Sequence, residues 1–226
     1  MKKAIVMTMF AAVATLALAD RDVDALNAVL ARVDDAETQF RIGNCYAEGK
    51  GVVASKEEAF RLYLKAAEQG HSDAQEALAK CYYKGDGVAK DMKKAAAWFL
   101  KAAEQGQLLA MSNIGSCYLY GYGVAKNEAE AVKWFRKAAE RGCAPAQCNL
   151  GFCYANGKGL ATNKAEAAKW YLKAAEAGCA KGQLNLALCY IYGDGVAKDR
   201  AEALKWCRMA ASQEPVLANG LMKLFQ

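Results

Sequence analysis

Residues 168–199 read AKWYLKAAEAGCAKGQLNLALCYIYGDGVAKD, and this stretch decides the fold. It holds one of five Cys-Tyr pairs in the chain, each beginning 36 residues after the one before it. A fixed interval of this length is typical of a repeat protein, so the architecture is predicted before any other feature is considered. The pairs are Cys45-Tyr46, Cys81-Tyr82, Cys117-Tyr118, Cys153-Tyr154 and Cys189-Tyr190.

Each repeat carries the signals of a helix end, a turn and a new helix. Two glycines, such as Gly193 and Gly195, follow the Cys-Tyr pair and suit a tight turn because glycine tolerates positive φ. A short polar residue then stands at an N-cap position, and in four of the five repeats a glutamate three residues later gives capping-box spacing. The predicted N-caps are Ser55, Asp91, Asn127, Asn163 and Asp199.

The apolar residues of each repeat recur at helical spacing and do not alternate as in a strand. One helix of the first repeat has an apolar stripe and ends near Gly70, and the next helix presents Ala74, Leu78 and Cys81. A helix pair cannot bury both of its faces alone, but stacked pairs can. The sequence therefore predicts an all-α fold, a right-handed α/α superhelical solenoid of about five 36-residue helix-turn-helix repeats. The stripe comprises Ala59, Leu62, Tyr63, Ala66 and Ala67.

The N-terminus differs from the repeats. Lys2 and Lys3 precede an apolar run that ends in Ala-Leu-Ala at residue 19, the pattern of a signal peptide with cleavage after Ala19. A short transmembrane anchor or a buried helix is the alternative, but the run is shorter than the roughly 20 residues that span a bilayer. We therefore expect a periplasmic or secreted protein without stable membrane insertion after cleavage.

The mature chain is interpreted as a single solenoid. We expect an N-terminal capping helix over residues 20–35, repeats over residues 36–212 and a C-terminal capping segment over residues 213–226. In the last segment Leu221, Leu224 and Phe225 are expected to cover the core. Lysines are interspersed with glutamates in every repeat, which indicates a solvated helix surface rather than the one-sided basic face that nucleic acid requires.

Nine cysteines are present, and the five periodic ones are predicted to be small core residues. Equivalent helices in a stack lie about 8–10 Å apart, whereas a disulfide needs Cα atoms within about 7 Å. Cys207 is also expected in the core, while Cys143 and Cys179 follow helix-ending glycines and are expected to be exposed. A pairing of Cys148 with Cys143 or Cys179 stays open. His71 is the only histidine and no CxxC motif occurs, so neither a metal site nor a cofactor is expected.

The pattern AxxWYxKAAxxG followed by NLGxxYxxGxGVxxD resembles the Sel1-like repeat family, which is related to tetratricopeptide repeats. This resemblance implies an α-solenoid adaptor that holds other proteins or peptides. A cysteine-rich subgroup of the family has disulfides within each repeat and has been linked to β-lactam binding. Neither its disulfides nor its activity carries over, because other residues occupy its cysteine positions. These are Ala67, Ala103, Ala139 and Ala175, and Gln39, Gln75 and Gln147.

The favoured function is a protein-binding or peptide-binding scaffold that uses its concave face. One aligned slot holds Arg41, Asn113, Asn149 and Asn185, and a ladder of asparagines can hold a peptide backbone through the side-chain amides. The alternative is that these asparagines bond to the backbone of the next helix. Nearby aromatic residues are candidate ligand anchors. They are Tyr83, Tyr120, Phe152 and Tyr192.

The sequence supports two other classes of function less well. A cell-envelope hydrolase or β-lactam-interacting enzyme would need an assembled site, and His71 has only its sequence neighbours Ser72 and Asp73 beside it. No serine begins an S-x-x-K motif, and no catalytic residue is predicted. A thiol-based redox or metal-handling protein rests only on the abundance of cysteine.

Overall fold

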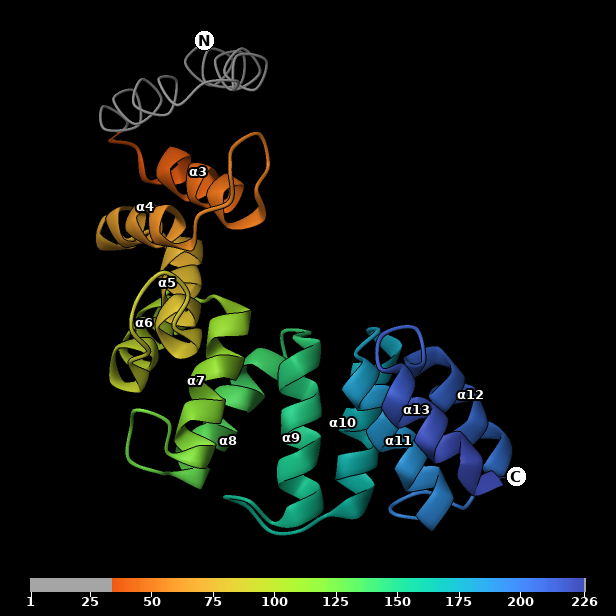
Figure 1. Ribbon diagram of the computed structural model, residues 1–226. Coiled ribbons are helices and arrows are strands. Elements are labelled where there is room, and N and C mark those ends of the chain that lie inside the picture. The colour runs from red at the N-terminus through yellow and green to blue at the C-terminus, as the bar shows by residue number, and fades with distance from the viewer. Residues whose placement is uncertain (1–33, 226) are drawn as a thin grey trace. The chain divides into compact units, whose positions relative to one another are not determined.

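The computed structural model describes residues 34–225, and all of these lie in helices or in the turns between them (Figure 1). The expected signal peptide and residues 20–33 of the expected capping helix lie outside the described residues. The α-helices are α3 Ala36–Glu48, α4 Lys56–Glu68, α5 Ser72–Lys84, α6 Met92–Glu104, α7 Leu108–Tyr120, α8 Glu128–Ala139, α9 Ala144–Asn156, α10 Lys164–Glu176, α11 Ala180–Tyr192, α12 Arg200–Ala210 and α13 Pro215–Met222, followed by a 3₁₀ turn, Lys223–Phe225.

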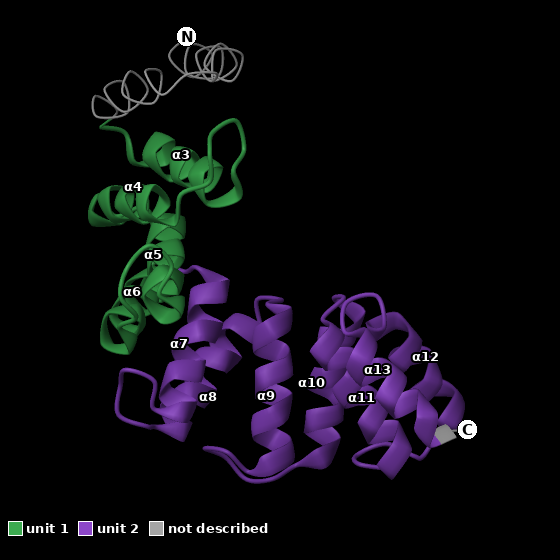
Figure 2. Ribbon diagram, viewed as in Figure 1, with its two compact units in different colours: residues 1–105 green, residues 106–226 purple. Residues whose placement is uncertain are grey.

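The chain divides into two compact units, residues 1–105 and 106–226 (Figure 2). The described part of the first unit holds the packed pairs α3–α4 and α5–α6, and α4 also packs on α5. In the second unit α7 packs on α8, α9 on α10 and α11 on α12, with α13 against α12. The prediction of an all-α fold built from repeated helix pairs is confirmed for residues 34–225.

The predicted N-caps are confirmed. Each of the five polar residues accepts a hydrogen bond from the backbone N–H three residues later, at 3.0–3.2 Å. Asp91 does so although Lys94 replaces the usual glutamate, because the cap needs only the side-chain oxygen at the N-cap position. No described residue from 34 to 225 has a positive φ unless it is glycine.

The second glycine of each turn is required by close packing as well as by its φ. At Gly87 a Cβ atom would lie 2.1 Å from the carbonyl oxygen of Lys56, and at Gly195 it would lie 2.1 Å from that of Lys164. These two turns therefore rest directly on the first helical turn of α4 and of α10, the second helix of the preceding pair in each case.

In three of the helix pairs an aromatic ring of the second helix packs on a glycine of the first. A Cβ at Gly115 would lie 2.6 Å from the ring of Phe135, and one at Gly151 would lie 2.8 Å from the ring of Tyr171. Phe135 is fully buried. The absence of a side chain at these two glycines therefore allows the paired helices to approach closely.

In the cysteine-rich subgroup a disulfide links two positions, and here a buried glutamine at one position hydrogen-bonds to the backbone at the other. The side-chain amides of Gln75, Gln147 and Gln183 each donate to a backbone carbonyl eight residues earlier, at 3.1–3.2 Å. A buried hydrogen bond of this kind contributes about 1 kcal/mol net, but an unpaired carbonyl left behind would cost more. The second helix of one repeat is thus tied to the first helix of the next repeat without a covalent link.

The cysteines predicted to lie in the core do so in five of six cases, while the two predicted to be exposed are not. Cys81, Cys117, Cys153 and Cys189 are buried, Cys45 is half-buried and Cys207 is fully buried. The expectation that Cys143 is exposed is wrong. It is the N-cap of α9, and its thiol turns inward toward the backbone carbonyl of Leu108, at 3.6 Å. Cys179, the equivalent residue one repeat later, is half-buried.

The C-terminal helix α13 covers part of the second unit. Ala218 is fully buried, and Leu221 packs against the cluster formed by Ala180, Leu184 and Ala210. The expectation that Leu224 covers the core is wrong, because α13 has ended before it and the side chain is 60% exposed. The side chain of Phe225 lies outside the described residues.

Candidate binding clefts

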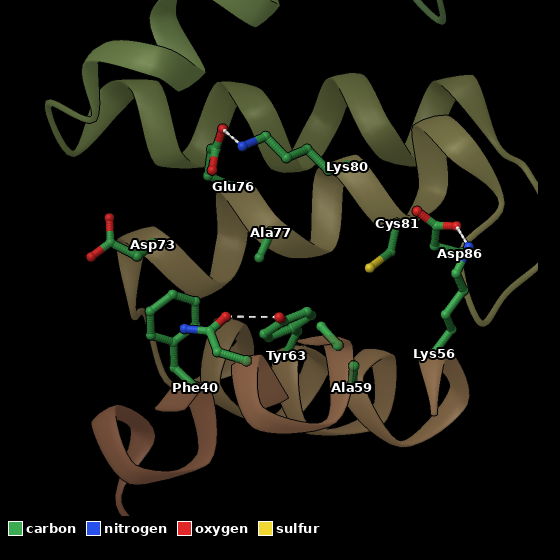
Figure 3. Close-up of a pocket in the computed structure, with 12 residues that line it drawn as sticks. Phe40, Lys56, Ala59, Tyr63, Asp73, Glu76, Ala77, Lys80, Cys81 and Asp86 are labelled. Carbon is green, nitrogen blue, oxygen red and sulfur yellow. Dashed lines mark hydrogen bonds and ion pairs between the residues drawn. The ribbon is translucent and has the colours of Figure 1, made fainter. Parts of the chain in front are cut away.

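The first cleft is a hollow of about 430 Å³ between α3, α4 and α5 (Figure 3). Its floor contains the small residue Ala59 and the phenol of Tyr63, which donates a 2.8 Å hydrogen bond to Oδ1 of Asn44. Lys56 and Asp86 close one end through an ion pair of 2.5 Å. The hollow therefore combines an apolar floor with a charged rim.

The wall that α5 contributes to the first cleft is strongly charged. Glu76 and Lys80 lie one helical turn apart and form an ion pair of 2.6 Å (Figure 3). Asp73 lies at the opposite end of the cleft from the Lys56–Asp86 pair, beside Phe40. A ligand in this cleft meets charges of both signs around an aromatic floor.

The second cleft, of about 350 Å³, lies between α9, α10 and α11 in the other unit. Eight lining residues occupy the same repeat positions as residues of the first cleft, three repeats later, and six of these positions hold the same residue type in both clefts. The ion pair recurs between Lys164 and Asp194 at 2.6 Å. The identical pairs are Ala47 and Ala155, Lys56 and Lys164, Ala59 and Ala167, Tyr63 and Tyr171, Cys81 and Cys189, and Asp86 and Asp194.

The titratable groups on both floors stay neutral. Burial raises the pKa of the Tyr63 and Tyr171 phenols well above the usual value. Burial also raises the pKa of Cys81 and Cys189 to about 11. At neutral pH these groups are hydrogen-bond donors rather than nucleophiles, so the cleft floors are suited to binding.

Two asparagines of the predicted ladder bond to side chains of the preceding repeat, and one of them also lines a cleft. Asn149 donates from Nδ2 to the Ser112 hydroxyl at 3.2 Å, and Asn185 donates from Nδ2 to the Cys148 thiol at 3.6 Å. The expected alternative, a bond to the backbone of the next helix, is wrong for these two residues, because they bond to a side chain of the preceding first helix. An amide has further hydrogen-bonding capacity, and Asn185 also lines the second cleft.

The other predicted ladder residues lie elsewhere. Asn113 is half-buried in α7, and Arg41 is exposed on α3 outside the lining of the first cleft. Ala77, which shares their slot, lines the first cleft. This slot therefore lines a cleft at Ala77 and at Asn185.

The four predicted aromatic anchors line neither of these two clefts. Tyr192 is 59% exposed at the end of α11, and Tyr120 is exposed and stacks on Tyr122 with ring centroids 5.5 Å apart. Tyr83 is exposed with Nζ of Lys90 5.9 Å from its ring centroid, and Phe152 is half-buried in α9. These residues offer aromatic surface beside the clefts rather than within them.

Sequence reasoning missed the ion pairs and the role of Tyr63 and Tyr171. A usable signal was present, because a lysine at the first helical position stands 30 residues before an aspartate between two glycines. In one of the two repeats between them the charges are exchanged, with Glu128 and Lys158 3.6 Å apart. Such an exchange indicates contact between the two positions.

The histidine considered for catalysis has a structural role. His71 is the N-cap of α5, where Nδ1 accepts from the N–H of Ala74 at 3.2 Å and Nε2 lies 3.0 Å from Oε2 of Glu37. Among residues 34–225, no three His, Cys, Asp or Glu side chains cluster as metal ligands would. No helix in the described part of the chain combines the length and apolar composition needed to cross a bilayer.

Five successive segments match the Sel1 repeat, namely residues 36–71, 72–107, 108–143, 144–179 and 180–215. The fold is similar to the crystal structure of a Sel1 repeat protein from Oxalobacter formigenes, with 38% identity, a TM-score of 0.77, and coverage of 82% of this chain and 74% of that one. A search of curated proteins gave no match.

A second similar structure is that of a protective antigen present in uropathogenic Escherichia coli strains, which displays an SLR fold. It is 37% identical with a TM-score of 0.79, and the match covers 86% of this chain and 42% of that one. A Sel1 repeat protein from Klebsiella pneumoniae is 19% identical over 87% of this chain and 96% of that one, with a TM-score of 0.58, and supports the fold alone.

Proposed function

This chain belongs to the Sel1 repeat family, and from that premise we propose that it is a non-catalytic scaffold that binds a protein or peptide across its two clefts. Sel1 repeat proteins generally mediate protein–protein interactions. The finer proposal concerns the binding face, which we take to be the concave face where the first helices of the repeats line the clefts.

The observation that carries the proposal is the recurrence of one cleft in both units. Each has a neutral tyrosine hydroxyl and an alanine at the floor and a Lys–Asp pair at the rim. A hydroxyl and an amide such as that of Asn185 supply hydrogen bonds to a peptide backbone, while the alanines leave room for a side chain. Two equivalent sites, one in each unit, suit a partner that presents two similar segments.

The test begins with peptides selected from a displayed random library against the full chain. We expect Leu188→Arg, which places a long charged side chain in the second cleft, to weaken binding of a selected peptide at least about tenfold. Lys169→Ala, on the exposed side of α10, is the matched control and should bind as the parent does. Equal binding by parent, Leu188→Arg and a corresponding Ala77→Arg variant would overturn the proposed face.

We further propose that the chain is exported with residues 1–19 as its signal peptide. The support is the sequence pattern of two lysines, an apolar run and Ala-Leu-Ala. N-terminal sequencing of the protein from fractionated cells should find Asp20 as the first residue in the periplasmic or secreted fraction. Protein that keeps residues 1–19 and remains in the cytoplasmic fraction would contradict export.

A further inference from the structure

One pair of cysteines lies outside both clefts and differs from the other thiols. Cys148 in α9 and Cys179 at the N-cap of α11 are hydrogen-bonded to each other through their thiols. We propose that Cys148 and Cys179 are a reversible disulfide site that links α9 to the start of α11.

The two sulfur atoms are held together by the packing of the second unit. Cys148 is 6% exposed and belongs to the core cluster against which half-buried Cys179 packs. Nδ2 of Asn185 in α11 lies 3.6 Å from Cys148 Sγ and fixes this side chain from the other direction. The helices α9 and α11 are also in contact, which holds the two segments that carry these thiols against each other.

The two thiols are electrostatically unequal. The pKa of Cys179 lies below the usual thiol value, because the Cys148 thiol and then the backbone N–H groups of Gly182 and Lys181 stabilise its thiolate. The pKa of Cys148 lies above the usual value, because of its hydrogen bond to Cys179 and its burial. Cys179 is thus the more reactive and more accessible thiol, and Cys148 is the resolving one.

The step is thiol–disulfide exchange with a small-molecule disulfide as the oxidant. The Cys179 thiolate attacks one sulfur of that disulfide, forms a mixed disulfide and releases one small thiolate. Cys148 then loses its proton and attacks the Cys179 sulfur, which forms the Cys148–Cys179 bond and releases the second small thiolate. Two electrons pass from the protein to the oxidant, which leaves as two thiols.

The preceding repeat provides an internal control. Cys143 occupies the same N-cap slot as Cys179, but Ser112 occupies the slot of Cys148. Asn149 donates to Ser112 just as Asn185 donates to Cys148, so the two environments match. Burial raises the pKa of Cys143, the opposite direction from Cys179. The proposed pair is also distinct from the slots of the cysteine-rich subgroup, which hold alanine and glutamine here.

The first experiment treats the reduced, folded full chain with oxidised glutathione, alkylates it after unfolding and maps its peptides by mass spectrometry. We expect a linked peptide that contains Cys148 and Cys179 and a protein about 2 Da lighter, since two hydrogens are lost. Cys148→Ser and Cys179→Ser should abolish the linked peptide, and Cys143→Ser should retain it. Failure of the parent to form this link, or its loss in Cys143→Ser, would overturn the proposal.

Two measurements keep the test independent of folding defects in the serine variants. In the parent at pH 6.5, iodoacetamide should modify Cys179 at least about tenfold faster than Cys143. The variant Ser112→Cys should form a second linked peptide between position 112 and Cys143 under the same oxidant. Circular dichroism verifies that each variant is helical. Equal alkylation rates, or no second link in a folded variant, would contradict the account.

Discussion

The two clefts share a framework and differ in the walls that the first helices supply. Glu76, Ala77 and Lys80 in the first cleft correspond to Leu184, Asn185 and Leu188 in the second unit. The tyrosine, the alanine and the ion pair are the same. The comparison indicates that the turn and the second helix fix the shape of each cleft, while the first helix sets which ligand chemistry it accepts.

The largest effect is expected where the framework depends on glycine. Gly87→Ala and Gly195→Ala should each lower the free energy of unfolding by more than about 3 kcal/mol, because a Cβ would collide with a backbone carbonyl in addition to straining φ. Urea unfolding followed by circular dichroism measures the change.

The matched controls are Gly70→Ala and Gly178→Ala. Both glycines have positive φ, but a Cβ there would meet no atom within 4 Å. These variants should lose only about 1–2 kcal/mol, the cost of the backbone conformation. Equal losses at all four positions would show that packing of the turn does not set the cleft framework.

Exchange of wall residues should change ligand preference with little effect on the framework. We expect Leu188→Lys to weaken a peptide selected for the second cleft by about tenfold, or about 1.4 kcal/mol, because a charged side chain enters a half-buried apolar wall. Lys80→Leu makes the reciprocal change in the first cleft. Isothermal titration calorimetry on both variants measures it, and unchanged affinity in both would contradict the assignment of specificity to the first helix.

A smaller effect is expected at the caps, which are alike in both units. Ser55→Ala and Asn163→Ala should each lower the free energy of unfolding by about 1 kcal/mol, because a first-turn N–H loses its acceptor. Asn219→Ala, at an exposed position of α13, is the control. A loss in only one of the two units would show that the caps are not equivalent.

The smallest effect on stability is expected at the rim ion pairs. Lys164→Met places at the rim the residue that the second repeat has at the same slot, Met92. The pair is solvent-exposed, so its removal should leave thermal unfolding almost unchanged. The same small effect is expected for Lys56→Met in the first cleft. Because the hydrogen bond and charge of Asp86 raise the pKa of Lys56, the contribution of this ion pair to stability is present at neutral pH and is lost only above the usual lysine pKa. A large loss of stability in either variant would make the rim part of the fold rather than of the site.

The fold was predictable because the repeat fixes local chemistry at every turn. The N-cap side chains, the glycine pairs and the alanine stripes each specify their own geometry, and all agree on helix pairs. The direction of the Cys143 side chain was not predictable, because position after a helix-ending glycine does not show which way an N-cap side chain turns. Leu224 was misplaced because the end of α13 depends on packing against α12.

The candidate site was harder to predict because its central residue has two roles. The ring of Tyr171 packs on Gly151 as a core residue, while the residue also lines the second cleft. The apolar stripe of a helix predicts which residues are buried in the core, but it does not predict which of them also line a cleft. Asn185 of the predicted asparagine slot lines the second cleft, but its bond to Cys148 depends on the neighbouring repeat and is not visible in a single repeat.

The most direct test of the central claim places a photo-cross-linking amino acid in the full chain and adds a selected peptide. With the probe at position 188, inside the second cleft, irradiation should join peptide to protein, and with the probe at position 169, on the exposed side of α10, it should not. Cross-linking at position 169 with none at position 188 would contradict the assignment of the clefts as the binding sites.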